Sequence, residues 1–156
     1  MRPPSVVTAT WNGEYRFDIS RAGAGVSSRI DAKGKTGPGP VDMLLGALAG
    51  CAAVDTLDIL LKRRTPAERL VITVTGDRAD AVPARVTAVT LAYSIDGPGI
   101  DREAAERAVD LAVSKYCSVR NSLDPTMPVR FSVTLNGEPG AERVVAPPQI
   151  PSPSGV

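Results

Sequence analysis

Cys51 and Cys117 are the two residues that could carry thiol redox chemistry, because the 156-residue chain has no other cysteine and no histidine. Without histidine, Cys–His and Ser–His–Asp catalysis lose their base. A zinc site with four protein ligands is also disfavoured, since two thiolates would need carboxylates to complete it. We therefore expect a cysteine activated by arginine or by its place in a helix, and a two-cysteine redox enzyme is our leading hypothesis.

Cys51 falls in the middle of a long predicted helix that runs from Pro40 to about Arg64. The helix dipole does not activate it, because the effect fades after the first turn. Asp55, one turn later on the same face, would disfavour a thiolate by like charge. A cation must therefore come from elsewhere, and without one Cys51 would be a small buried core residue. The candidate cations lie in the N-terminal β region: Arg29, Arg16 and Arg21.

Cys117 ends a second predicted helix, which Asp101 could cap. The apolar residues of this helix recur at helical spacing as far as Tyr116, and Cys117 lies one position off their stripe. For Cys117 taken alone, the alternative to a functional role is a partly exposed cysteine of no consequence. The two cysteines together are more suggestive, because one thiol can attack and the other can resolve.

The remaining elements predict an α+β protein. Strands are expected over residues 5–11, 15–19, 26–30, 70–74, 89–95 and 129–135. Asn12-Gly13 is a strong hairpin signal between the first two, and the loop at 31–40 lacks the glycine spacing of a phosphate-binding loop. We expect one domain over residues 1–137 and a proline-rich tail, disordered or polyproline-like, over 138–156.

Composition limits the kinds of partner. A net charge of +1 argues against nucleic acid or an anionic membrane as the main partner. Residues 1–20 lack a charged start followed by an apolar core, so no signal peptide is expected. The longest apolar run, Val41 to Ala53, is broken by Asp42 and too short to span a bilayer. We expect a cytoplasmic protein, where paired cysteines are more often catalytic or redox-sensing than structural.

Two segments resemble the OsmC/Ohr family, which comprises osmotically inducible protein C and the organic hydroperoxide resistance proteins. The segment from Gly37 to Cys51 looks like the helix signature of that family. The segment from Lys115 to Val119, followed by Asn121-Ser122-Leu123, looks like its second cysteine motif. The order of strands and helices agrees as well, so the resemblance covers roughly residues 5–137.

The resemblance implies an OsmC-like fold, with antiparallel sheets on two long helices, and an intertwined homodimer with two active sites at its interface. It implies a peroxidase that reduces organic hydroperoxides without a metal or a bound organic cofactor. Cys51 would attack the peroxide to give a sulfenic acid, and Cys117 would resolve it as a disulfide. An external dithiol, lipoyl-type in this family, would reopen that disulfide. The OsmC-type pattern places the catalytic arginine shortly before the Gly/Pro loop, where Arg29 fits best.

The sequence departs from the family pattern in two places: at an acidic position, and at the first hairpin, where hydroperoxide resistance proteins carry an arginine and this chain has Trp11-Asn12-Gly13. The better-studied hydroperoxide reductases carry a glutamate ten residues before the first cysteine, where this chain has Val41 followed by Asp42. On a regular helix Asp42 lies about 180° around from Cys51, so it can serve only if the helix starts late or the loop bends back. The departure favours a rival hypothesis, a non-enzymatic binding or stress protein of the same fold. A third is a redox sensor whose Cys51–Cys117 disulfide changes the affinity for a partner.

Overall fold

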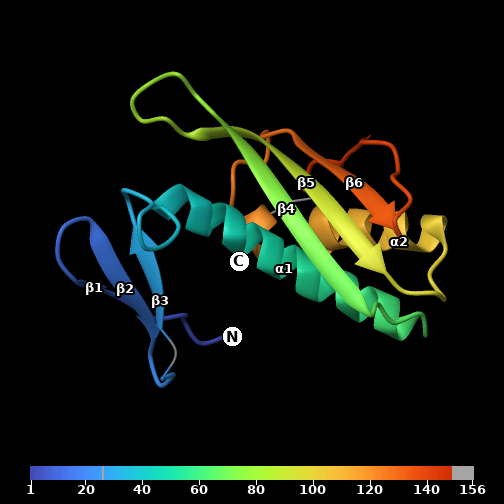
Figure 1. The fold of residues 1–156 in the computed structure, drawn as a ribbon, viewed down its shortest axis with the longest axis horizontal. Coiled ribbons are helices and arrows are strands. Elements are labelled where there is room, and N and C mark those ends of the chain that lie inside the picture. The colour runs from blue at the N-terminus through green and yellow to red at the C-terminus, as the bar shows by residue number, and fades with distance from the viewer. Residues whose placement is uncertain (26, 149–156) are drawn as a thin grey trace. The chain divides into compact units, whose positions relative to one another are not determined.

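The computed structural model describes residues 1–25 and 27–148, and its contacts divide the chain into two compact units. The first unit is Met1–Leu44 and the second begins at Leu45. Both strands and helices are present (Figure 1), so the predicted α+β class is confirmed. The single domain expected over residues 1–137 is thus described as two units.

The first unit is a three-stranded antiparallel sheet in the order β1-β2-β3. Its strands are β1 (Val7–Trp11), β2 (Arg16–Arg21) and β3 (Ser27–Asp31). The Asn12-Gly13 hairpin is confirmed, although Trp11 pairs with Phe17 and the turn is therefore longer than two residues. Gly13 adopts a φ of 80°, a left-handed conformation that glycine reaches at little cost. Val26, the first residue of the third predicted strand, lies outside the described residues.

The second unit is built on a four-stranded sheet in the order β4-β5-β6-β7. The strands are β4 (Arg69–Arg78), β5 (Val86–Asp96), β6 (Val129–Leu135) and β7 (Arg143–Val144). β4 and β5 form the long antiparallel hairpin predicted from their alternating residues. β5 and β6 run parallel, so the chain must cross over between them. That crossover contains α2 (Arg102–Leu111), a π-helical turn η1 (Ala112–Tyr116) and a short helix α3 (Ser118–Asn121).

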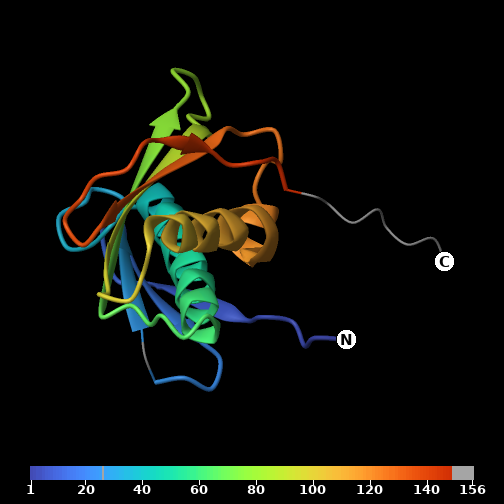
Figure 2. The same cartoon turned by 90° about the vertical axis from the view of Figure 1, so that its right-hand side faces the viewer.

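Helix α1 (Pro40–Lys62) begins in the first unit and continues through the second, with bounds close to those predicted. Within the second unit, α1 and α2 lie on the same face of the sheet (Figure 2). The buried residues of α1 recur every four positions, as expected for a helix packed by one stripe: Leu48, Ala52, Thr56 and Leu60.

The core of the second unit lies between this sheet and its helices. Alternate residues of β5 and β6 face it, and each fully buried aliphatic or aromatic side chain contributes roughly 1.5–3 kcal/mol. The core residues of the two strands are Val89, Leu91, Tyr93, Ile95, Val129, Phe131, Val133 and Leu135. The crossover helix α2 is held at its start by Asp101, whose carboxylate accepts a hydrogen bond from the Ala104 amide at 2.7 Å, as predicted.

The π-helical turn corrects the predicted exposure of Cys117, which is fully buried. The Cys117 amide donates to the Ala112 carbonyl at 2.8 Å, a bond that spans five residues and not four. The extra residue in this turn rotates the chain that follows it. Cys117 therefore moves from beside the apolar stripe onto the core side.

The structure also differs from the predicted C-terminal tail. Arg143–Val144 forms β7 and pairs with Arg130 and Phe131 of β6. Val145 is buried, and its amide donates to the Val129 carbonyl at 2.9 Å. Residues 138–148 therefore cover the edge of the sheet, while the rest of the predicted tail, 149–156, lies outside the described residues.

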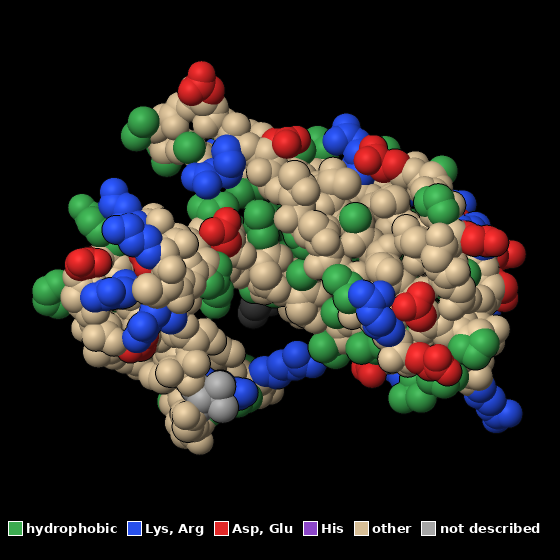
Figure 3. Space-filling view, in the orientation of Figure 1, with side chains coloured by type: hydrophobic (Ala, Val, Ile, Leu, Met, Phe, Trp, Pro, Cys, Tyr) green, Lys and Arg blue, Asp and Glu red, His purple; other side chains and the backbone are tan. Residues whose placement is uncertain are grey.

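Helix α1 is the one helix of the described part that is long and apolar enough to cross a membrane, judged by length and composition alone. The apolar run from Val41 to Ala53, which by itself is too short to span a bilayer, is only part of this helix. The core helix of a soluble protein passes the same test, and 22% of the most apolar window of α1 is buried in this structure. Acidic and basic side chains are interspersed on the visible surface of the second unit (Figure 3), in keeping with the net charge of +1.

Candidate functional site

The two cysteines meet in the second unit, together with one carboxylate. The sulfur atoms of Cys51 and Cys117 and a carboxylate oxygen of Asp55 all lie within 4.8 Å of one another. Both cysteines are free thiols. Since a disulfide needs a sulfur–sulfur distance of about 2.05 Å, a modest approach of the two side chains would allow one to form. The site therefore joins α1 to the junction between η1 and α3.

Cys117 is the more deeply buried thiol, and its surroundings keep it protonated. Burial raises the pKa of the Cys117 thiol, and a hydrogen bond and like charge from Cys51 raise it further. The Arg120 amide, which donates a hydrogen bond to the Cys117 sulfur at 3.4 Å, lowers the pKa and only partly offsets these effects. Cys117 thus retains its proton at neutral pH, while its sulfur caps the first turn of α3.

Asp55 lies one helical turn after Cys51, on the face predicted from the sequence. Partial burial raises the pKa of Asp55, and the neighbouring Asp58 adds to the rise. Asp55 also borders a surface groove of about 360 Å³. The groove is lined by Asp55, Asp58, Ile59, Lys62, Arg63, Leu111 and Tyr116.

Tyr93 contributes a buried hydroxyl that sequence reasoning treated only as part of a strand. The side chain is 2% exposed, and its hydroxyl has no hydrogen-bond partner among the described residues. Thr56 of α1 lies beside this hydroxyl, and its own hydroxyl donates to the Ala52 carbonyl at 2.8 Å. Burial raises the pKa of Tyr93, interaction with the Thr56 hydroxyl lowers it in part, and the negative forms of Cys117 and Asp55 add to the rise.

Arg120 is a buried arginine that the sequence analysis did not single out. Its guanidinium donates to the carbonyls of Asp124, Pro125 and Met127 at 3.0, 3.4 and 3.2 Å. Its burial lowers the pKa of the guanidinium. Arg120 therefore ties the loop after α3 to the helix turn that holds Cys117. Its position three residues after the cysteine is the one sequence signal that could have identified it.

The predicted arginine and acid lie in the first unit. Arg29 donates to both carboxylate oxygens of Asp18 at 2.8 and 3.2 Å, across the β2–β3 pair, and Asp18 holds the pKa of Arg29 above its ordinary value. Asp42 accepts a hydrogen bond from the Gly39 amide at 2.9 Å and so caps the start of α1. Of the alternatives, Arg16 donates to the Asn12 carbonyl at 3.4 Å, and Arg21 is exposed at the end of β2.

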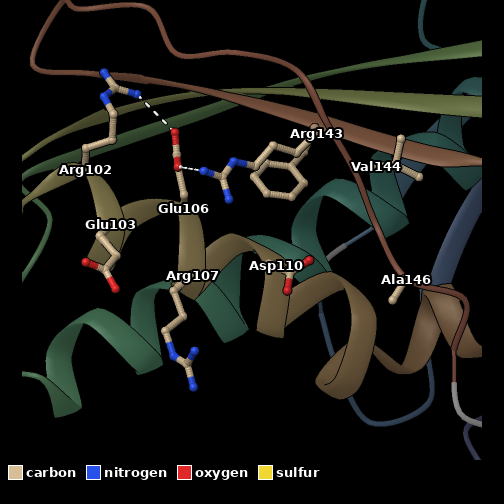
Figure 4. Close-up of a pocket in the computed structure, with 9 residues that line it drawn as sticks. Arg102, Glu103, Glu106, Arg107, Asp110, Arg143, Val144 and Ala146 are labelled. Carbon is tan, nitrogen blue, oxygen red and sulfur yellow. Dashed lines mark hydrogen bonds and ion pairs between the residues drawn. The ribbon is translucent and has the colours of Figure 1, made fainter.

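A larger hollow of about 760 Å³ lies beside α2 and β7, and Glu106 in its lining binds two arginines (Figure 4). Buried Glu106 pairs with Arg102 at 3.4 Å and with Arg143 at 2.6 Å. The lining holds three arginines and three acidic residues. Because its buried carboxylate already has two cationic partners, this hollow is a weaker candidate site than the thiol cluster.

Comparisons with known proteins agree with this fold. The family model described as OsmC-like protein matches residues 32–132. Protein YhfA of Escherichia coli K12 is 33% identical over 99 residues, which cover 64% of this chain and 74% of YhfA. An OsmC-like protein of Mycoplasma pneumoniae superposes with a TM-score of 0.74 at 20% identity, over 86% of this chain and 99% of the other. The organic hydroperoxide resistance protein OhrB of Bacillus subtilis superposes with a TM-score of 0.56 at 17% identity, over 85% and 97%.

Proposed function

This chain belongs to the family of OsmC-like proteins, and from that premise we propose that it is a thiol peroxidase which reduces organic hydroperoxides with Cys51 and Cys117. The observation that carries the proposal is the approach of two free thiols, 66 positions apart in sequence, to within 4.8 Å. Relatives of the same fold that are named for organic hydroperoxide resistance support the choice of substrate.

In the first step Cys51 attacks as a thiolate. Its sulfur forms a bond to the terminal peroxide oxygen while the O–O bond breaks, which leaves Cys51 sulfenic acid and an alcohol once the leaving alkoxide takes a proton. The assignment of attack to Cys51 is supported by the surroundings of Cys117, whose burial keeps that thiol protonated. Cys51 is also the less buried of the two.

In the second step Cys117 resolves the sulfenic acid. The Cys117 sulfur displaces hydroxide from Cys51, a disulfide forms, and the thiol proton leaves with the hydroxide as water. Asp55, within 4.8 Å of both sulfurs, can take that proton from Cys117 and pass it on. An external dithiol, of the lipoyl type or another, then exchanges with the disulfide and restores both thiols.

We propose that Arg29 is the cation that stabilises the Cys51 thiolate, with Arg16 and Arg21 as alternatives. The support is its place shortly before the Gly/Pro loop and the two-point contact with Asp18, which orients a planar guanidinium. Asp42, the other proposed site residue, would act through the start of α1, which it caps.

We further propose that the working form is a cytoplasmic homodimer. Helix α1 presents an exposed apolar stripe beside its buried one, formed by Val54, Leu57 and Leu61 with exposed fractions of 60%, 40% and 63%. The first unit likewise exposes Trp11 and Tyr15. Such apolar surface is typical of a face that a partner covers, and a second copy of the chain is the occupant that the family resemblance implies.

A redox sensor without rapid turnover is the second candidate. Two observations favour it: Cys117 is fully buried, and the guanidinium of Arg29 is already bound by the Asp18 carboxylate. In a sensor, the same Cys51–Cys117 disulfide would form slowly and alter the surface offered to a binding partner. The two functions therefore differ in the rate of thiol oxidation and not in its product.

Stopped-flow oxidation by cumene hydroperoxide tests the proposal. The wild-type protein and Cys117→Ser should lose the Cys51 thiol much faster than free cysteine does, and Cys51→Ser should not react rapidly. Cys117→Ser should stop at the sulfenic acid, whereas wild type should proceed to the disulfide. Oxidation of wild type no faster than free cysteine would reject the peroxidase and leave the sensor.

A further inference from the structure

Cys51, Asp55 and Cys117 also have the composition of a metal-binding site. We propose that the reduced protein binds one thiophilic divalent cation, such as Zn²⁺, through the two cysteine sulfurs and the Asp55 carboxylate, with the fourth position open to water. The sequence alone argued against zinc because two thiolates lack carboxylate partners. The fold supplies one, since Asp55 lies within 4.8 Å of both sulfurs.

The distances are close to those that coordination needs. Zinc binds thiolate sulfur at about 2.3 Å and carboxylate oxygen at about 2.0–2.2 Å, so tetrahedral ligand atoms lie roughly 3.3–3.8 Å apart. The three ligand atoms are already within 4.8 Å of one another. Rotations of the Cys51 and Asp55 side chains, which are only partly buried, can supply the remaining contraction of about 1 Å.

The three proposed ligands lie on helices that fix their positions. Cys51 and Asp55 are one turn apart on α1, the spacing by which two residues of a helix can hold one ion. Cys117 is fixed between η1 and α3, where the Arg120 amide bonds to its sulfur. The groove beside Asp55 offers an entry path from the surface.

The site and the disulfide exclude each other. Binding takes both cysteines as thiolates and releases their two protons, whereas oxidation joins the same two sulfurs and removes two of the three ligands. Given the proposed peroxidase function, a hydroperoxide, the two ion-bound thiolates and two protons yield the disulfide, the alcohol, water and the free ion. The metal would therefore be held only by the reduced state and would shield Cys51 from other reagents.

Binding can be measured without any peroxide. Protein reduced with a phosphine is titrated with Cd²⁺, followed by the ultraviolet band of cadmium thiolate, and with Zn²⁺ in competition with a chromophoric chelator. One ion should bind per chain, Asp55→Asn should weaken binding at least about tenfold, and either cysteine-to-serine variant should weaken it more. Asp80→Asn, which removes an equal charge at an exposed position outside both the cluster and the groove, should bind as wild type does.

Two results would overturn the metal site: no stoichiometric binding by wild type, or equal binding by wild type and Asp55→Asn. Circular dichroism checks that each variant is folded. A test on wild type alone needs no variant, because one equivalent of Zn²⁺ must slow alkylation of Cys51 and a chelator must restore it. Peroxide oxidation measured with the chelator present tests the peroxidase separately.

Discussion

The Arg120 amide donates a hydrogen bond to the Cys117 sulfur, and the Arg120 side chain binds three carbonyls of the following loop. One residue thus fixes the second thiol and the loop that precedes β6. A charged group that is 2% exposed is unusual unless its hydrogen bonds are satisfied, and most of those of Arg120 are.

Arg120→Met should lower the free energy of unfolding by about 2–4 kcal/mol, because three carbonyls lose a charged donor. Urea unfolding of the reduced protein measures this change. Arg107→Met, at an exposed position on α2, is the matched control and should change stability little. A similar loss in both variants would mean that the buried hydrogen bonds of Arg120 are not the cause.

The contribution of Asp55 to stability should depend on pH. Burial raises its folded-state pKa above the ordinary 3.8, so the native state holds the proton more tightly than the unfolded chain. The favourable contribution is present below 3.8 and is lost as the pH rises through the folded value. Asp55→Asn should therefore gain stability relative to wild type over that window.

Urea unfolding of both proteins between acid and neutral pH measures that difference. Asp80→Asn serves as the control, since Asp80 is exposed and is not among the groups that shift the pKa of Asp55. A difference between wild type and Asp55→Asn that does not change with pH would contradict the expectation.

Arg29→Lys should slow the oxidation of Cys51 by hydroperoxide at least about tenfold, because lysine cannot reproduce a planar two-point contact. Arg21→Lys is the control on the neighbouring strand and should leave the rate unchanged. The rate constant is obtained from stopped-flow oxidation at several peroxide concentrations. If Arg21→Lys or Arg16→Lys slows the reaction and Arg29→Lys does not, the assignment of the cation passes to that residue.

Leu61→Asp should shift the protein from dimer to monomer, because it places a charge in the exposed apolar stripe of α1. Lys62→Asp, one position away and exposed as well, is a control for charge alone. Sedimentation velocity at several concentrations measures the equilibrium. If the wild-type protein sediments as a monomer at every concentration, the proposal of a homodimer is wrong.

The spacing of apolar residues along the sequence predicted most helices and strands correctly, but it did not predict that Cys117 is buried. Alternating residues identified β4, β5 and β6, and the spacing of four residues placed Asp55 beside Cys51 in an unbroken helix. Cys117 depended on a π-helical turn, whose one-residue shift leaves no periodic trace in the sequence. Helical periodicity extrapolated through that turn therefore placed the residue on the wrong side.

Features held by distant contacts were also not predicted. The two residues of β7 are too few to show alternation, and they are ordered by pairing with β6. Arg120 and Tyr93 look in sequence like a surface charge and an ordinary strand residue. Their burial comes from tertiary packing around the crossover, which a reading of neighbouring residues does not contain.

The parallel pairing of β5 and β6 requires the crossover that carries Cys117 to fold back over the sheet, next to α1. A covalent link between the sulfurs would close a loop of 66 positions in the unfolded chain and, by chain entropy, favour the native state by about 4 kcal/mol. Folding and oxidation would then reinforce each other. The reduction potential of this cysteine pair would accordingly report on the integrity of the whole second unit.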